Sequence, residues 1–142
     1  MKVRWQWSIV VLVVVLGLAR AQDSGYKPDQ KWVAPAEAVS KKNPLAANPD
    51  AAAGGKKLFL RSCAECHNED GTGLQKAANL TIPEVQAETD GALFWKISNG
   101  HVRKGMPSFS RLPEMQRWQL ILFIRSLKSA DQSSSDAQAK EH

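Results

Sequence analysis

The sequence has few of the residues that carry chemistry in many protein classes: two cysteines, three histidines and three methionines among 142 residues. No segment alternates apolar and polar residues between hairpin turns, and no stretch of the chain is repeated elsewhere. These absences argue against a β-sheet fold and against a repeat architecture. The length allows one small domain.

A large excess of charge of one sign is also absent. The full chain carries 19 basic and 14 acidic residues. Lys2, Arg4 and Arg20 belong to the first 21 residues, so the remainder has 16 basic against 14 acidic side chains, a net charge of +2. A nucleic-acid-binding domain would present a dense basic patch. The charge balance therefore argues against a nucleic-acid partner.

The chain also lacks an apolar run of transmembrane length. Its longest run, residues 8–19, has about a dozen residues against the roughly 20 that cross a bilayer. The run follows two basic residues and ends in the small residues Ala19 and Ala21, as a secretory signal does. We predict a cleaved signal peptide over residues 1–21 and a periplasmic mature protein. The alternative is an uncleaved segment that anchors the protein in the membrane.

Polar segments flank the region that can form a domain. Residues 22–48 contain three prolines and no sustained apolar period, which predicts an extended arm or linker. This arm either docks on the domain through residues 32–34 or is a mobile spacer. Residues 130–142 have nothing to bury and predict a disordered tail. The domain is therefore assigned to residues 49–129.

Within that domain every start and stop signal is helical. The expected helices begin at a capping residue or a proline and end near a glycine or a polar residue. They cover residues 49–60, a short helix opened by a capping box at 81–84, residues 90–99, and a largely buried helix over residues 113–128. The fold class is all-α. Four short helices bury too little apolar surface to offset chain entropy comfortably, so a further group is expected at the centre.

The two cysteines belong to one motif, Cys63-Ala-Glu-Cys66-His67. C-x-x-C-H is the signature of covalent c-type haem attachment. Thiols at i and i+3 project from one side of a helical turn, where they can meet the two vinyl groups of a porphyrin edge. The next side chain can then present an imidazole nitrogen to the iron. The motif predicts Cys63 and Cys66 as attachment residues and His67 as an axial ligand.

Three other interpretations of these residues are weaker. A thioredoxin-like redox pair needs a β-α-β frame, which the sequence does not contain. A zinc site would have to recruit His101 or His142 and to turn the adjacent Cys66 and His67 toward one ion. A disulfide between Cys63 and Cys66 would close a very short loop and stabilise little.

An electron carrier needs a second axial ligand from the protein. Met106 is the best candidate, because the glycine before it and the proline after it suit a loop that presents a ligand. His101 and then Met115 are the alternatives. We predict His67 and Met106 as the two iron ligands.

Further motifs make the chain similar to the monohaem class I cytochromes c. They occur in the order of that family and cover Gly55–Phe59, Cys63–His67, Asp70–Gly73, Gly105–Pro107 and Leu120–Leu127. The resemblance implies a small helical domain wrapped around one covalently attached haem. It also implies that the first and last helices cross, with Gly55 near Leu120 and Phe59 against Phe123.

One loop departs from the family pattern. Many members carry a proline after the haem motif whose carbonyl accepts the N–H of the proximal histidine. Residues 76–80 of this chain read Lys-Ala-Ala-Asn-Leu, with alanine where the proline would be expected. A backbone carbonyl of this loop can still orient the histidine. The sequence leaves open which one does so.

The resemblance implies an exported carrier of single electrons that is not itself an enzyme. Its redox partners would be a dehydrogenase, a cytochrome complex or a terminal oxidase. The alternatives are a haem subunit of a larger dehydrogenase or oxidase complex, and a haem enzyme or sensor with a labile sixth ligand.

The sequence leaves the role of two features near the predicted site open between two interpretations. Trp95 either donates its indole N–H to a haem propionate or covers apolar core, and the second is favoured. Four basic residues either form a docking rim for acidic partners or belong to an ordinary solvated surface. These are Lys96, Arg103, Lys104 and Arg111.

Overall fold

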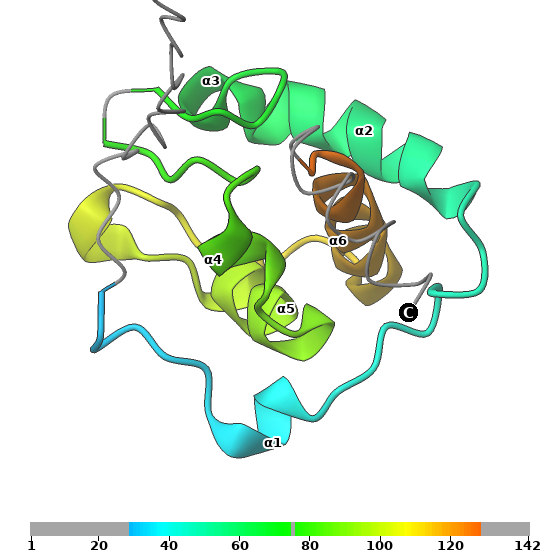
Figure 1. Cartoon of the computed structure of the whole chain (residues 1–142), viewed down its shortest axis with the longest axis horizontal. Coiled ribbons are helices and arrows are strands. Elements are labelled where there is room, and N and C mark those ends of the chain that lie inside the picture. The colour runs from blue at the N-terminus through cyan, green and yellow to red at the C-terminus, as the bar shows by residue number, and fades with distance from the viewer. Residues whose placement is uncertain (1–28, 75, 129–142) are drawn as a thin grey trace, which may run out of the picture.

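The computed structural model describes residues 29–74 and 76–128. Within these ranges it contains six α-helices, one 3₁₀ helix and no β-strand, which confirms the all-α class (Figure 1). The elements are α1 (Ala36–Val39), α2 (Ala51–Ser62), α3 (Ala64–His67), α4 (Pro83–Gln86), α5 (Asp90–Asn99), η1 (Val102–Lys104) and α6 (Glu114–Ser126). The expected signal peptide, residues 1–21, and the expected tail, residues 130–142, lie outside the described residues. In the part of the chain that the structure describes, no helix is long and apolar enough to cross a membrane.

The helix starts differ from the predicted ones in detail. α2 begins at Ala51 and α6 one residue after Pro113. The predicted capping box of α4 is wrong, because its N-cap residue is Ile82 and carries no side-chain cap. Thr81 instead donates its hydroxyl to the side-chain oxygen of Asn79 at 2.8 Å. The side chain of Thr81 therefore stabilises a local turn instead of capping the helix as the sequence had predicted.

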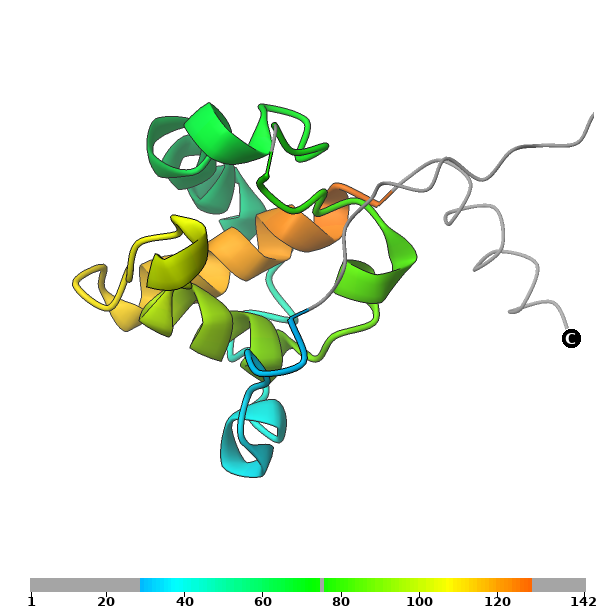
Figure 2. The ribbon, with the colours of Figure 1, turned by 90° about the vertical axis from the view of Figure 1, so that its left-hand side faces the viewer.

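The crossing of α2 and α6 is the main contact of the domain. A Cβ atom on Gly55 would lie 2.0 Å from the carbonyl oxygen of Gln119, so the two backbones meet where no side chain fits. One turn later Phe59 and Phe123 contact each other with ring centroids 5.0 Å apart. Figure 2 shows α6 running through the middle of the molecule, between α2 on one side and α5 on the other. The predicted crossing is confirmed, and a mid-helix glycine that costs about 1 kcal/mol in helix propensity is explained.

The main core lies where α2, α5 and α6 meet. Phe59, Leu120 and Ile121 are the largest fully buried side chains. Phe94 of α5 stacks on Trp118 of α6 with ring centroids 4.0 Å apart. Three long helices thus bury one contiguous apolar cluster.

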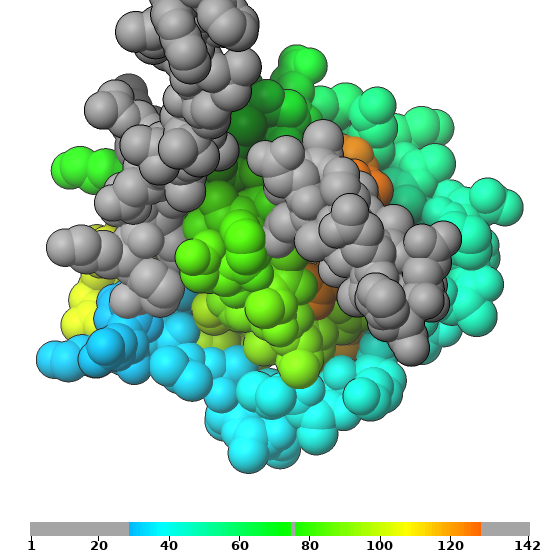
Figure 3. All heavy atoms as spheres, in the orientation of Figure 1, coloured from blue at the N-terminus to red at the C-terminus, as the bar shows by residue number. Residues whose placement is uncertain are grey.

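The arm is folded onto the domain instead of extending away from it. α1 lies against α5, and a Cβ atom on Gly91 would lie 2.0 Å from the carbonyl oxygen of Ala38. Ala34 and Ala38 form a second, small cluster with Ala92, and Trp95 covers it. The space-filling view shows the arm, blue to cyan, as a band along one edge of the molecule (Figure 3). Residues 29–48 therefore dock on the domain, and the expected extended arm contains a short helix, Ala36–Val39.

Polar contacts complete the docking of the arm. The amide of the buried Asn43 donates to the carbonyl of Trp118 at 3.2 Å. The hydroxyl of Thr89 donates to the carbonyl of Val39 at 2.9 Å while it accepts from the N–H of Ala92 as the cap of α5. These contacts join the arm to α6 and to the start of α5.

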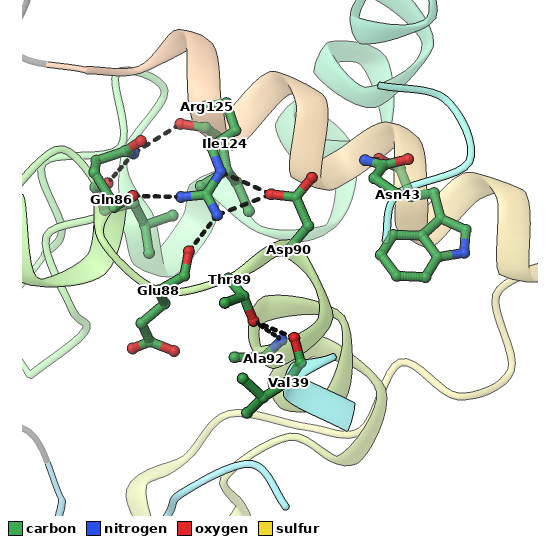
Figure 4. A network of polar contacts seen from close by, with 11 residues as sticks. Val39, Asn43, Gln86, Glu88, Thr89, Asp90, Ala92, Ile124 and Arg125 are labelled. Atoms are coloured by element: carbon green, nitrogen blue, oxygen red, sulfur yellow. Dashed lines mark hydrogen bonds and ion pairs between the residues drawn. The ribbon is translucent and has the colours of Figure 1, made fainter. Parts of the chain in front are cut away.

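A single arginine ties the region between α4 and α5 to α6 (Figure 4). Arg125 donates to the Asp90 carboxylate at 2.9 Å, to the carbonyl of Gln86 at 2.7 Å, and to the carbonyl of Glu88. The amide of Gln86 donates in turn to the carbonyl of Ile124 at 2.9 Å. The end of α6 is thereby held against the chain that follows the haem-motif loop.

Candidate haem site

The C-x-x-C-H motif forms the junction between α2 and α3. Cys63 ends α2, and the carbonyl of Cys63 accepts the N–H groups of Cys66 at 3.1 Å and of His67 at 2.9 Å. Both thiols are free; Cys63 is partly buried and Cys66 is exposed. The three side chains therefore belong to one helical turn, as the spacing of the motif predicts.

A backbone carbonyl orients the ring of His67. Its Nδ1 atom lies 2.9 Å from the carbonyl oxygen of Ala78. With the proton on Nδ1, the Nε2 atom is left as the nitrogen that can bind a metal. Ala78 is thus the carbonyl that the sequence could not name, and the missing proline of the loop was the signal that pointed to this stretch.

Burial affects the protonation of this histidine. It lowers the pKa of His67, and the hydrogen bond to Ala78 opposes that effect only in part. The neutral imidazole is the form that binds iron. The environment of His67 therefore favours the neutral imidazole.

The loop after the motif folds back on it through a tight turn. The N–H groups of Gly73 and Leu74 donate to the carbonyls of His67 and Cys66, each at 2.8 Å. Gly73 has a φ of +82°, and a Cβ atom there would lie 2.6 Å from the carbonyl oxygen of Ala77. Only glycine fits such a position. This turn brings the next part of the loop, with Ala78, over the histidine.

The start of the same loop is a turn built on Asp70. The backbone N–H and the hydroxyl of Thr72 donate to the Asp70 carboxylate at 3.0 and 2.7 Å. These hydrogen bonds hold the pKa of Asp70 below its usual value. The Asp-Gly-Thr-Gly segment thus shapes the start of the loop.

The environment of Cys63 argues against a thiol redox function. Burial, and to a smaller extent the nearby Cys66, raise the pKa of Cys63 to about 11. A catalytic thiol of the thioredoxin type needs a lowered pKa. Among the described residues, no group of three or more His, Cys, Asp and Glu side chains is placed to hold a bare metal ion. The zinc interpretation gains no support from the described ranges, and His142 lies outside them.

Met106 closes a small loop against the main core. His101 and Met106 exchange two backbone hydrogen bonds, of 2.8 and 3.2 Å, with η1 between them. Gly105 makes the turn with a φ of +93°. The side chain of Met106 is half-buried and contacts the main core, as that of Cys63 does. Two of the four predicted site residues thus border the same apolar cluster.

The two alternative ligands are placed differently. The ring of His101 stacks on Trp32 of the arm, with centroids 4.6 Å apart and planes inclined by 19°. Its Nε2 atom lies 3.2 Å from the Asp29 carboxylate, within ion-pair distance. Met115 is 48% exposed in the first turn of α6. Trp32 and His101 are far apart in the sequence, and no local sequence pattern predicted their contact.

The four basic residues near the Met106 loop do not form one set. Lys96 pairs with Glu88 at 2.6 Å, and its ammonium group lies 4.7 Å from the ring centroid of Trp32. The other three side chains are exposed. They are Arg103, Lys104 and Arg111. A docking rim, if built from this group, consists of these three.

A helical domain with a C-x-x-C-H turn, a histidine held by a backbone carbonyl and a methionine loop on its core defines the class of c-type cytochrome domains. Residues 50–124 match the family described as cytochrome c oxidase, cbb3-type, subunit III. The match covers more than half of the chain, which therefore belongs to this family of cytochrome c domains. A search of curated proteins gave no match. The chain is accordingly an electron-transfer haem protein, and its cofactor is haem c.

Proposed function

We propose that the protein is an exported carrier of single electrons with one haem, attached through Cys63 and Cys66 and ligated by His67 and Met106. The observation that carries this proposal is the 2.9 Å contact between Nδ1 of His67 and the carbonyl of Ala78. His67 lies on the same helical turn as the two free thiols. That contact with Ala78 would leave Nε2 as the nitrogen that binds the haem iron, as second-shell hydrogen bonds do for metal-binding histidines. When bound, haem supplies a one-electron iron couple.

The chain's own residues explain why such a carrier would need little rearrangement. Ala78 holds the tautomer and the orientation of His67, and the two backbone hydrogen bonds to His101 hold the loop of Met106. If His67 and Met106 both bind the iron, they would leave it no position for a substrate, so we propose no catalytic role. A thioether ligand favours iron(II) relative to a second imidazole, which places the carrier at moderately high potential.

The family description supports an oxidase or a cytochrome complex as the redox partner. Arg103, Lys104 and Arg111 would form a rim for an acidic docking surface. We propose a periplasmic location, with attachment to the membrane only if residues 1–21 are not cleaved. The second candidate is a permanent haem subunit of such a complex, which the words "subunit III" favour. Co-purification from native membranes at high salt distinguishes a subunit from a free carrier.

Optical spectra of the purified holoprotein test the ligand assignment. The oxidised protein is expected to show the weak long-wavelength absorption of a sulfur–iron(III) bond, and the reduced protein to resist carbon monoxide. Met106→Ala should abolish the first, permit carbon monoxide binding and lower the reduction potential. Met115→Ala is the matched control, because that methionine is exposed and should change nothing. A silent Met106→Ala variant, or a wild-type protein that binds carbon monoxide readily, would overturn the assignment in favour of another sixth ligand or a sensor.

A further inference from the structure

The arm places one aromatic side chain on the base of the Met106 loop. The indole N–H of Trp32 donates to the carbonyl of Gly100 at 2.9 Å. Its ring stacks on His101, with centroids 4.6 Å apart. A turn that starts at Asp29 holds Trp32 there, because the N–H of Trp32 donates to the carbonyl of Asp29 at 2.9 Å. Two contacts of one side chain thus reach two adjacent residues of the domain, Gly100 and His101.

Those two residues form the point where the ligand loop closes. Gly100 has a φ of +65°, and a Cβ atom there would lie 2.4 Å from the backbone of Pro107. The hydroxyl of Ser108 donates to the carbonyl of Ser98 at 2.6 Å and adds a second closure. The loop from Gly100 to Pro107 therefore has a narrow base, and the arm covers it. Because this base closes the loop, a shift there is expected to move Met106.

His101 is a nitrogen donor that lies opposite Met106 in the backbone bridge that closes the loop. His101 and Met106 form an antiparallel bridge in which they exchange two backbone hydrogen bonds. In such a pair the two Cα atoms are typically about 5.5 Å apart. The Nε2 atom of His101 is buried and makes no hydrogen bond among the described residues. The carboxylate of Asp29, which the arm also supplies, lies 3.2 Å from this nitrogen. The arm thus occupies both the face and the free nitrogen of this imidazole.

We propose that Trp32 is a positioning residue that reserves the sixth iron position for Met106 by keeping His101 turned into the arm. This inference rests on the proposed ligation by Met106. The indole covers the ring of His101 and fixes the carbonyl of Gly100, so the imidazole cannot rotate toward the haem. Without Trp32, an imidazole one bridge away from Met106 competes with the thioether for iron(III), for which nitrogen is the stronger donor.

Spectra and potentials of four full-length holoprotein variants test this proposal. Trp32→Ala is expected to lose most of the sulfur–iron(III) absorption and to lower the reduction potential. Trp32→Phe keeps a ring over His101 without the N–H donor and should retain more of that absorption. Val33→Ala is the matched control. Val33 is next to Trp32 in the chain but is 66% exposed, so this substitution should leave the spectrum unchanged. Covalent attachment keeps the haem in all four, and equal helical circular dichroism shows that they are folded.

The double variant Trp32→Ala/His101→Ala separates competition from loosening. It should recover the absorption and the potential of the wild type, since the competing nitrogen is gone. Full absorption in Trp32→Ala, or no recovery in the double variant, would overturn the role of Trp32. Failure of the proposed function is visible separately, because the wild-type protein itself would then lack the sulfur–iron(III) absorption.

Discussion

Two glycine-mediated helix crossings hold the molecule together, one inside the domain and one between the domain and its arm. A Cβ atom would lie 2.0 Å from a carbonyl oxygen at both, that of Gln119 facing Gly55 and that of Ala38 facing Gly91. The surroundings differ. The crossing at Gly55 joins helices of 12 and 13 residues, whereas the arm contributes a helix of four residues.

The two interfaces are stabilised by different means. Large fully buried side chains, such as Phe59 and Leu120, surround the first crossing. Alanines and a few hydrogen bonds, such as that from Asn43 to Trp118, surround the second. Buried apolar area dominates stability, so the first crossing holds the domain and the second holds only the arm. We expect the arm to open at a lower free energy than the domain unfolds.

The largest expected effect is at the first crossing. Gly55→Val places a branched side chain against the backbone of Gln119 and should lower the free energy of unfolding by several kcal/mol, on the order of 3 or more. Chemical denaturation of the holoprotein measures this.

Gly54→Ala is the matched control for that substitution. Its Cβ atom would meet only the flexible side chain of Gln119, at 3.0 Å. Helix propensity then favours alanine by up to about 1 kcal/mol, so stability should be unchanged or higher. An unchanged denaturation midpoint in Gly55→Val would contradict the close crossing.

A smaller effect is expected at the second crossing. Gly91→Val should push α1 away from α5, because the carbonyl of Ala38 cannot yield without moving the arm. The free energy of domain unfolding should fall by only about 1 kcal/mol. Amide exchange of residues 34–43 should accelerate strongly, while that of α6 stays slow.

The distinction between the two crossings would be wrong if amide exchange accelerated equally in residues 34–43 and in α6. Equal acceleration of exchange in α6 and in the arm of Gly91→Val would mean that the arm and the domain unfold as one unit. By the role proposed for Trp32, the same variant should also weaken the sulfur–iron(III) absorption.

The smallest expected effect concerns acid and the loop that carries Ala78. Hydrogen bonds from Thr72 lower the pKa of Asp70 in the folded state, so its contribution to stability is present above the unfolded value, about 3.9, and is lost as pH falls toward the folded pKa. Asp70→Asn should therefore flatten the decline of the denaturation midpoint below about pH 4. A decline identical to that of the wild type would show that Asp70 is not linked to folding. The exposure of Asp70 keeps this effect small.

Local patterns determined much of the domain. The spacing of Cys63, Cys66 and His67 predicted one helical turn, because side chains at i and i+3 must share a face. The family resemblance implied a close crossing at Gly55, and the cost of a glycine within a helix, about 1 kcal/mol in propensity, agreed with it. The C-terminal end of α5 followed from Asn99 and Gly100, whereas its N-cap, Thr89, was not predicted. In each case a few neighbouring residues determine the geometry.

Contacts between distant residues were decided only by the tertiary structure. The carbonyl of Ala78 contacts His67 because of the way the loop turns, and the sequence does not specify that turn. From the sequence alone, any of several carbonyls in residues 76–80 could have accepted this hydrogen bond. Trp32 and Gly100 are 68 residues apart, and an indole can stack on many surfaces. The sequence by itself predicted that this chain attaches haem at a C-x-x-C-H turn. Only the fold decided which carbonyl orients the histidine and that the arm covers His101, because both depend on the packing of complete helices.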